Sequence, residues 1–298
     1  MRGVCGKGAG NGYRRAARLL LALGSLWGGF VMVSSDAQGQ KAPGAGEARP
    51  AEKLVVTAHR GFSGACPENT LAAFRAAIEA GSDRIELDVH LTRDNEVVVI
   101  HDDTLERTTT GKGNVADKTL AELRRLDAGA WFDARFAGEK IPTLAEVLDM
   151  ARNRIVVNIE LKKGKNFPYT MAELADRTLF VVEKAGMTGQ VLFSSFDPAA
   201  VDRIREINPR LPLALIVEKP WVNPGEPGRG TLYPALNCKT MVLNADNIRR
   251  AQAGGIEIHV WTVNAPEAME KFIALGVDGI ITNHPDRLIG ILKKRAKR

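Results

Sequence analysis

The stretch Ile85-Glu86-Leu87-Asp88-Val89 places two acidic side chains in a run that is otherwise apolar. Successive side chains of a β-strand point to opposite faces, so Glu86 and Asp88 share one face and the apolar residues share the other. Carboxylates on such a strand rarely lack a function. The stretch therefore predicts a strand with one face available for chemistry.

Nine apolar, β-branched runs occur along the chain, and most are separated by segments with helical periodicity. Apolar strands that alternate with helices are typical of parallel strands covered on both faces. Because about 260 residues follow position 37, the length suits one (β/α)8 barrel. We therefore predict an α/β fold of the TIM-barrel type. The predicted strands span residues 54–58, 85–89, 97–100, 155–161, 191–193, 213–217, 241–243, 256–263 and 279–282.

Two segments depart from this regular alternation. Residues 92–96, between the second and third runs, are too few for a crossover helix, so these runs are predicted to form a hairpin. Residues 103–142 are predicted to be a short insertion after the third strand, acting as a lid over the barrel mouth. A doubly wound open sheet is the alternative fold, but no Gly-x-Gly-x-x-Gly or Walker loop follows a predicted strand.

The helix between the first two strands has clear end signals. Apolar residues recur at helical spacing from Leu71 onwards. Asn69 or Thr70 is suited to cap the first turn, and Gly81 is suited to end the helix. We therefore predict a helix between these positions.

The N-terminal residues carry the pattern of an export signal. A basic segment precedes an apolar run at 19–33, and a small-x-small site follows at Ser35 and Ala37. This predicts a signal peptide over residues 1–37 and an exported protein, periplasmic or secreted. An uncleaved anchor is the alternative, although an apolar run of about 15 residues is short for a span that needs about 20. Arg14-Arg15 leaves the general and twin-arginine export routes both open.

The remaining chain divides into a linker and a domain. Residues 38–53 are rich in Ala, Gly, Pro and Glu and are predicted to be flexible, which leaves 54–298 as the barrel domain with a basic tail. The net charge of +6 does not indicate nucleic acid binding, because basic residues concentrate in the predicted signal and in residues 293–298. This tail can make weak contacts with an anionic membrane surface, or it can simply be solvated. The oligomeric state stays open.

Two cysteines remain after the predicted signal, Cys66 and Cys238. Two widely spaced cysteines in a chain of this size do not form a disulfide framework. They can pair with each other, or both can be buried thiols.

A third carboxylate joins the two of the opening stretch. Glu160 ends the fourth run, and Lys162 follows on the same strand face. Three carboxylates at one barrel mouth repel each other unless a positive group lies among them. A hard cation with oxygen ligands, Mg²⁺ or Ca²⁺, answers this need. The alternative is a charged cluster neutralised by Lys or Arg.

Other strand ends carry groups suited to a phosphoester. His59 ends the first run and His101 the third, so if these strands are neighbouring and parallel, both imidazoles reach one mouth and can act as base and acid. Arg60 and Lys162 suit phosphate oxygens, although Arg60 can instead neutralise Glu86 or Glu68. Trp261 can pack a glycerol moiety or fill the core.

The other histidines are predicted to have no direct chemical role. His90 is predicted to lie past the end of its strand, His259 in the pocket wall and His284 in a loop.

At these positions the sequence resembles the glycerophosphodiester phosphodiesterase family, over residues 54–290. The resemblance implies a metal-dependent (β/α)8 barrel that hydrolyses glycerophosphodiesters, such as glycerophosphocholine or glycerophosphoethanolamine, to sn-glycerol 3-phosphate and an alcohol. The matching motifs are His59-Arg60-Gly61, Pro67-Glu68-Asn69-Thr70, Glu86-Leu87-Asp88-Val89, His101-Asp102, Asn158-Ile159-Glu160-Leu161-Lys162, Trp261-Thr262-Val263-Asn264 and Asp278-Gly279-Ile280-Ile281-Thr282.

The resemblance also assigns roles to residues. It implies that Glu86, Asp88 and Glu160 hold Mg²⁺ or Ca²⁺. It also implies that His59 and His101 form the acid–base pair and that Arg60 and Lys162 bind phosphate.

Two other functions compete with this one. A lysophospholipase D acting on intact lysolipids uses similar residues, and a catalytically silent binding protein can share the barrel. The silent protein is disfavoured because His59, His101 and all three carboxylates are present. Attack by a glycerol hydroxyl, through a cyclic phosphate, and direct attack by water are both compatible with these residues.

Overall fold

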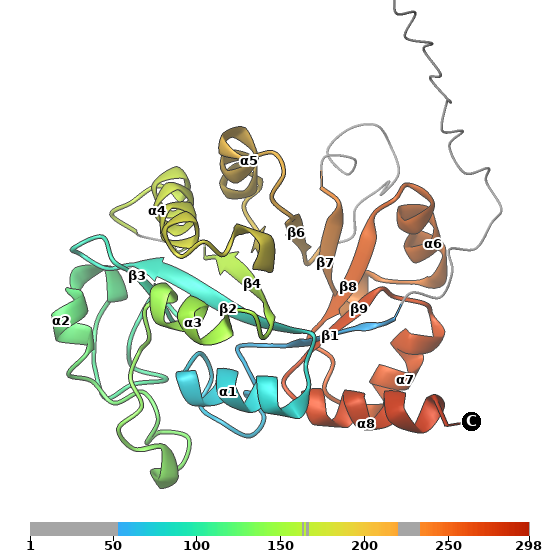
Figure 1. The fold of residues 1–298 in the computed structure, drawn as a ribbon, viewed down its shortest axis with the longest axis horizontal. Coiled ribbons are helices and arrows are strands. Elements are labelled where there is room, and N and C mark those ends of the chain that lie inside the picture. The colour runs from blue at the N-terminus through green and yellow to red at the C-terminus, as the bar shows by residue number, and fades with distance from the viewer. Residues whose placement is uncertain (1–52, 163, 165–166, 220–232, 298) are drawn as a thin grey trace, which may run out of the picture. The chain divides into compact units, whose positions relative to one another are not determined.

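Eight parallel strands close into a barrel in the computed structural model, which describes residues 53–162, 164, 167–219 and 233–297 (Figure 1). The strand β1 pairs in parallel with both β2 and β9, which joins the two ends of the sheet. The predicted (β/α)8 barrel is thus confirmed. The strands are β1 (Val55–Ala58), β2 (Arg84–Leu91), β3 (Val97–Val99), β4 (Val156–Leu161), β5 (Val191–Ser195), β6 (Leu213–Val217), β7 (Ala235–Lys239), β8 (Glu257–Trp261) and β9 (Gly279–Thr282).

The strand β3 is the ninth in the described sheet and does not belong to the barrel wall. It pairs antiparallel with the end of β2, with Val99 opposite Val89 and Val97 opposite Leu91. The predicted hairpin is therefore confirmed. As a consequence, β2 pairs with β4 up to Val89 and with β3 from Val89 to Leu91.

One predicted strand is wrong. The strand predicted at 241–243 overlaps a 3-10 turn, η5 (Thr240–Val242), and the strand itself lies earlier, at β7. The reason is that β7 carries Asn237 and Lys239 on the face that lines the barrel interior and mouth, so it does not form a continuous apolar run. Polar residues that serve the pocket concealed this strand in the sequence.

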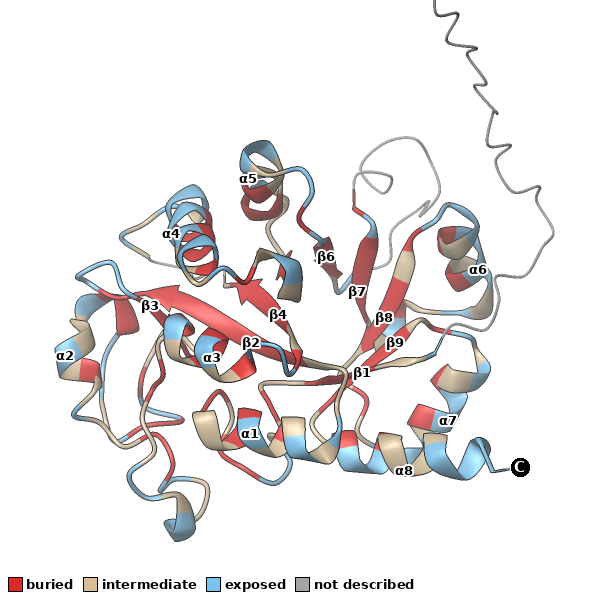
Figure 2. Cartoon of the chain, in the orientation of Figure 1, coloured by how far each residue is buried: buried red, intermediate tan, exposed pale blue. Residues whose placement is uncertain are grey.

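Helices cover the outside of the barrel, with their buried sides against the strands and their exposed sides in solvent (Figure 2). Helix α1 begins as predicted, because the Thr70 hydroxyl accepts from the Ala73 N–H, and it ends at Gly81 with φ 86°. The described helices are α1 (Leu71–Ala80), α2 (Leu120–Leu123), α3 (Leu144–Ala151), α4 (Met171–Lys184), α5 (Pro198–Ile207), α6 (Ala245–Ala253), α7 (Pro266–Ala274) and α8 (Pro285–Arg295).

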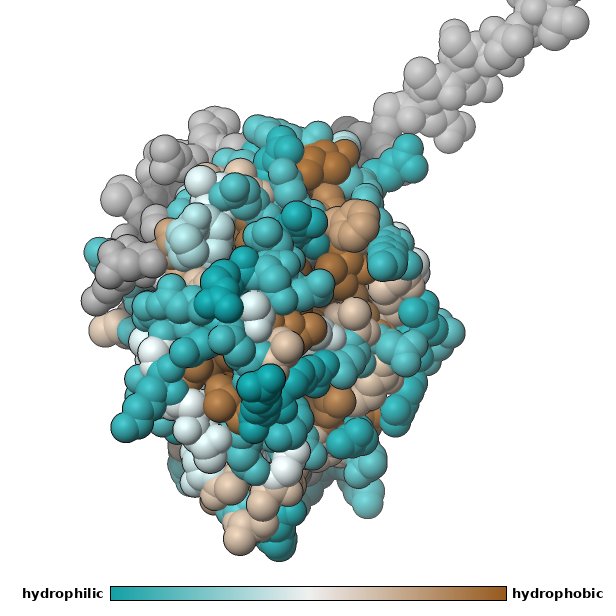
Figure 3. Space-filling view, turned by 90° about the vertical axis from the view of Figure 1, so that its left-hand side faces the viewer, coloured by the Kyte–Doolittle hydropathy of each residue, from teal (hydrophilic) through white to brown (hydrophobic). Residues whose placement is uncertain are grey.

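The insertion after β3 has a small apolar core of its own. Val98 and Ile100, at β3 and its exit, pack with Leu105, Val115 and Leu123 of the insertion. The insertion therefore rests on the outer side of the β2–β3 hairpin. The face of the molecule on this side is largely hydrophilic, with hydrophobic areas between the polar ones (Figure 3).

Several predictions concern the ends of the chain and the cysteines. The predicted signal peptide, 1–37, and all of the predicted linker except Lys53 lie outside the described residues. Among the helices that the structure describes, none combines the length and the apolar character that a bilayer span requires. Cys66 and Cys238 are both buried free thiols, so they do not pair.

Candidate active site

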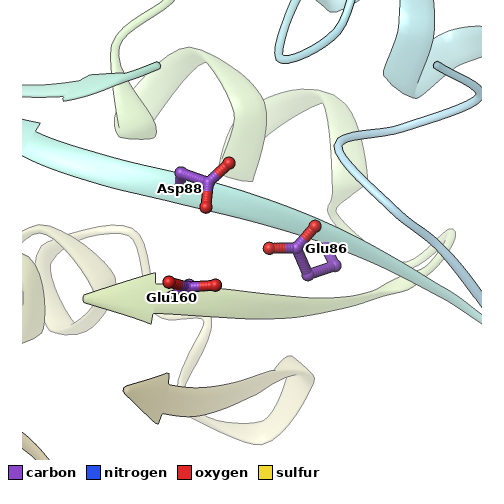
Figure 4. Close-up of side chains that lie close together, drawn as sticks. All are labelled: Glu86, Asp88 and Glu160. Carbon is purple, nitrogen blue, oxygen red and sulfur yellow. The ribbon is translucent and has the colours of Figure 1, made fainter. Parts of the chain in front are cut away.

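Three buried carboxylates lie together on neighbouring strands. Glu86 and Asp88 come from β2 and Glu160 from β4, with Asp88 and Glu160 directly opposite each other in register. Figure 4 shows the three side chains together on the two strands. One oxygen of each lies within 4.8 Å of the others, which is close enough for all three to hold a single metal ion. The alternating strand pattern therefore brings these residues together as predicted.

Among the described residues, Glu86 Oε1 has neither a hydrogen bond nor an ion pair, whereas Glu160 Oε1 has only its ion pair with Lys162. Glu86 Oε2 accepts the Arg60 backbone N–H at 2.8 Å, whereas buried Glu86 Oε1 has no hydrogen-bond partner among the described residues. Asp88 Oδ2 accepts from the Asn69 amide at 2.8 Å, and Glu160 Oε1 lies 2.7 Å from the Lys162 ammonium. A buried carboxylate oxygen without a donor fits a site for a cation with oxygen ligands.

The pKa values of the three buried acids are shifted in different directions. Burial, together with the charges of Asp88 and Glu160, raises the pKa of Glu86 well above its usual range. Burial also raises the pKa of Glu160 to about 7, although Lys162 opposes this. Burial also favours a higher pKa for Asp88, but the positive charges of Lys162 and Arg60 outweigh this effect and hold the pKa of Asp88 below its ordinary value. The raised pKa values of Glu86 and Glu160 indicate that the neighbouring cations do not balance all three carboxylates, and a divalent cation bound there would offset the excess negative charge.

His59 follows β1 and is oriented by the far end of the chain. Its Nδ1 lies 2.7 Å from the amide oxygen of Asn283, which can only accept, so Nδ1 carries the hydrogen and Nε2 is the basic nitrogen. Burial and the charge of Arg60 lower the pKa of His59 to about 4. His59 is therefore a neutral imidazole near pH 7, as a proton acceptor must be.

His101 reaches the same pocket as His59, although the two residues do not follow neighbouring parallel strands, which was the condition under which they were predicted to meet. The strand β3 is antiparallel to β2, and His101 enters the pocket from the predicted hairpin. Its Nδ1 lies 2.6 Å from Asp102 Oδ1. Burial lowers the pKa of His101, while the neighbouring carboxylates of Asp88 and Asp102 oppose this.

Arg60 is held in a strained and well-anchored position. It adopts a left-handed backbone with φ 55°, which few non-glycine residues do. Its guanidinium donates to Glu68 at 2.8 Å and lies 3.5 Å from Asp88. The following Gly61 (φ 78°) packs so tightly on Ala73 that a Cβ would lie 2.7 Å from its backbone, so only glycine fits there.

An ion-pair chain connects the two sides of the site. Arg107, from the insertion, donates to both oxygens of Asp102 at 2.6 and 2.9 Å and to both oxygens of Glu68 at 2.8 and 2.9 Å. Glu68 in turn holds Arg60, and Asp102 holds His101. Sequence reasoning missed Arg107 because nothing in the local pattern of the insertion marks it.

Most of the predicted residues line a single cavity of about 270 Å³. Asp88 is the exception, because it is buried beneath the cavity beside Arg60 and Lys162. The predicted residues that line the cavity are His59, Arg60, Glu86, His101, Glu160, Lys162 and Trp261.

The opposite wall of the cavity comes from β5 to β8. Trp261 is fixed by a hydrogen bond from its Nε1 to the Asn237 carbonyl at 2.9 Å, and Phe196 meets its ring edge-on at 5.7 Å. Glu218 and Lys239 also line this wall, 3.9 Å apart. These polar residues follow or end barrel strands, and that position could have identified them from the sequence.

Two histidines differ from their predictions. His90 was expected past its strand, yet it lies within β2 and is buried, because β2 extends to Leu91 to pair with β3. His259 was expected in the pocket wall, but it is buried in the barrel beside Glu257 and Gly279 and is not among the residues that line the cavity. His284 precedes helix α8 as a loop residue, as predicted.

Comparisons with known proteins agree with this architecture. The model of the glycerophosphoryl diester phosphodiesterase family matches residues 59–287. A glycerophosphodiester phosphodiesterase of Caldanaerobacter subterraneus subsp. tengcongensis is 38% identical over 243 residues, which are 81% of this chain and 99% of that protein. A glycerophosphodiester phosphodiesterase of Bacillus subtilis is 33% identical over 258 residues, covering 79% of this chain and 85% of the relative.

A solved structure extends the match to three dimensions. A phosphodiesterase of Oleispira antarctica, in complex with the product sn-glycerol-3-phosphate, has 28% sequence identity and a TM-score of 0.74, covering 80% of this chain and 96% of that one. Fold, motifs and relatives agree, and this chain is an enzyme that belongs to the glycerophosphoryl diester phosphodiesterase family.

Proposed function

We propose that this enzyme hydrolyses small glycerophosphodiesters, such as glycerophosphocholine or glycerophosphoethanolamine, to sn-glycerol 3-phosphate and an alcohol. The observation that carries the proposal is the convergence of both histidines, both phosphate-suited cations and two of the carboxylates on one cavity, with the third carboxylate, Asp88, close to the other two. The product named for the Oleispira antarctica relative supports the glycerol 3-phosphate end of the substrate.

The proposal includes one divalent cation, Mg²⁺ or Ca²⁺, held by Glu86, Asp88 and Glu160. The unpartnered oxygen of Glu86 and the raised pKa of two buried acids support it. A cation bound there supplies positive charge that stabilises a negatively charged phosphoryl group. Carboxylate oxygens suit either ion, so the choice between them rests on measurement.

The two histidines move protons in this scheme. The neutral Nε2 of His59 takes the proton from a glycerol hydroxyl as its oxygen bonds to phosphorus, and His101 gives a proton to the leaving alcohol oxygen as its P–O bond breaks. The cyclic phosphate that results is opened by water with the same groups acting in reverse. Direct attack of water on phosphorus, with His59 taking the water proton, is the competing scheme.

Arg60 and Lys162 are proposed to hold the phosphate. Each is partly buried next to Asp88 and so is positioned before the substrate binds. Burial opposes the charge of Lys162, but Asp88 and Glu160 outweigh it and hold its pKa above the ordinary value, so it is an ammonium at every working pH. A preorganised pair of cations binds phosphate oxygens at little cost in side-chain entropy.

The opposite wall is proposed to bind the organic groups of the substrate. The fixed ring of Trp261 with Phe196 offers an apolar surface to the glycerol carbons. Glu218 offers a carboxylate to a cationic head group, which is consistent with choline or ethanolamine.

The lysophospholipase D reaction remains the alternative activity. A cavity of about 270 Å³ holds a glycerophosphodiester, whereas an acyl chain of a lysolipid has to extend beyond it. The small volume therefore favours the deacylated substrate. A silent binding protein is disfavoured because both histidines face the cavity beside the carboxylates.

A direct assay tests the proposal. Residues 38–298 are stripped of metal and offered glycerophosphocholine, with and without Ca²⁺ or Mg²⁺, and release of glycerol 3-phosphate is followed beside a His59→Ala control. Release that needs a cation and is lost in the variant is the expected result. Absence of release with either ion, followed by activity on lysophosphatidylcholine, would replace this proposal with the alternative.

Export and membrane contact are proposed separately. We propose that residues 1–37 direct export and are removed, which mass spectrometry of the mature N-terminus tests; retention of these residues would indicate an anchor.

The basic residues Lys293, Lys294 and Arg295 end α8, a helix about 16 Å long that begins just after Asn283, the partner of His59. In a (β/α)8 barrel each helix runs back from the carboxyl ends of the strands, where the pocket lies. A tail bound to anionic lipid would thus keep the pocket away from the membrane, which suits a water-soluble substrate.

A further inference from the structure

His90 is a buried histidine that the proposed chemistry does not use. It is 1% exposed and lies on β2, two residues after Asp88. Its Nε2 lies 3.1 Å from the backbone carbonyl oxygen of His101, and its Nδ1 lies 3.3 Å from the Tyr169 hydroxyl. Its ring therefore contacts both the segment that carries a proposed catalytic group and a loop beyond β4.

The partners determine which nitrogen carries the hydrogen. A carbonyl oxygen only accepts, so His90 Nε2 donates to His101, and Nδ1 is then the acceptor for the Tyr169 hydroxyl. That hydroxyl also accepts the Leu91 N–H at 3.3 Å. Phe167 meets the His90 ring edge-on at 5.0 Å and stacks on Tyr169 at 4.7 Å. The ring of His90 is thus held in one orientation.

The main chain of His101 needs such support. The strand β3 is only three residues long, and His101 lies two residues after its end. Just before it, the Ile100 N–H donates to the Asp88 carbonyl at 3.0 Å. Together with the bond from His90, this attaches both ends of the residue pair 100–101 to β2, which lies between β3 and β4 (Figure 1).

We propose that His90 is a positioning residue, which fixes the main chain of His101 so that its imidazole faces the phosphoester, and that Tyr169 fixes His90. This inference rests on the acid–base role proposed for His101. A displacement of about 1 Å in a reacting group can lower a rate by about 100-fold, so one hydrogen bond at this point is sufficient to affect turnover.

A double-mutant cycle with His101 tests the proposal. His90→Leu removes both hydrogen bonds, and His90→Gln restores a donor near the position of Nε2. In the otherwise unchanged enzyme, His90→Leu should lower kcat about 10-fold or more with KM within about twofold, and His90→Gln should recover most of the rate. In a His101→Asn background, His90→Leu should change kcat less than about twofold, because residues that act through one another are not additive.

The assay uses a glycerol phosphodiester of p-nitrophenol, so that the slow His101→Asn enzymes remain measurable. The matched control is His259→Leu, since His259 is also 1% exposed but contacts Glu257 on β8. His259→Leu should change kcat by the same factor in the enzyme with His101 and in the His101→Asn enzyme. Tyr169→Phe, which removes one hydroxyl, gives a milder version of the cycle if His90→Leu does not fold.

Two results would overturn the proposal. One is a His90→Leu enzyme, or a Tyr169→Phe enzyme where the former is unfolded, with unchanged kcat. The other is an equal loss of kcat with and without His101. If the enzyme without any substitution releases no glycerol 3-phosphate, the proposed function itself is overturned. The failure of the positioning role and the failure of the proposed function are therefore distinguishable.

Discussion

His101 Nδ1 and Asp102 Oδ1 lie 2.6 Å apart, and Arg107 holds the same carboxylate through two hydrogen bonds. Adjacent residues in the chain thus form an imidazole–carboxylate pair, and an arginine from the insertion fixes its geometry. Burial alone would raise the pKa of Asp102, but hydrogen bonds from Arg107 and His101 lower it to about 2. The carboxylate is therefore charged throughout the range in which the enzyme is expected to work.

Asp102→Asn should lower kcat about 10- to 100-fold without unfolding the protein. The amide can still accept from His101 Nδ1, but it loses the negative charge that stabilises the protonated imidazole and the ion pair with Arg107. Steady-state kinetics on glycerophosphocholine would measure this, with Glu122→Gln as a control, because Glu122 is an exposed acid of the insertion away from the cavity. A kcat equal to that of the unchanged enzyme would contradict a role for Asp102.

Asn283→Asp should shift the acid limb of the pH–rate profile upwards. In the enzyme without substitutions, the neutral Asn283 amide orients His59 and adds no negative charge beside it. Burial is the largest cause of the low pKa of His59, about 4. A carboxylate at the same position favours the imidazolium, so the base is protonated at a higher pH and the rate falls earlier on acidification. The measurement is kcat/KM against pH, and an acid limb that does not move would exclude His59 as the group that titrates.

Glu86→Gln should stabilise the metal-free protein above pH 7. A buried carboxyl with a raised pKa stabilises the fold below its unfolded pKa and loses this contribution as the pH rises towards its folded pKa. Glutamine keeps an acceptor for Arg60 and removes the charge, so we expect a gain of about 1–2 kcal/mol at pH 8 and none near pH 4. Thermal unfolding in chelator would show this, and a lower melting temperature at pH 8 would contradict it.

Cation binding should strengthen as the pH rises through about 7. Glu160 has a pKa of about 7, so at pH 5.5 a cation has to displace its proton, whereas at pH 8 the carboxylate is already free. The rise in melting temperature on adding Ca²⁺ or Mg²⁺ should therefore be larger at pH 8 than at pH 5.5 and absent in Glu86→Gln. An equal rise at both pH values would indicate that the cation binds elsewhere.

Local pattern predicted most of the fold and the acidic cluster correctly. Apolar runs located eight of the nine described strands, and alternation placed Glu86 and Asp88 on one face, because the side-chain period of a strand depends only on neighbouring residues. The missed strand, β7, carries Asn237 and Lys239, whose polar character reflects a pocket rather than a core. Periodicity fails where function requires polar residues on a barrel strand.

The relationships across the barrel depended on the tertiary structure. Asn283 meets His59 from 224 residues away only because β9 closes the barrel onto β1. The antiparallel pairing of β3 likewise extends β2, buries His90 and brings His101 to the pocket from the side. The sequence alone thus determined which segments form strands and which faces carry charge, since these follow from short-range geometry. Barrel closure and strand direction decided which charges meet, because those contacts join residues that no local pattern connects.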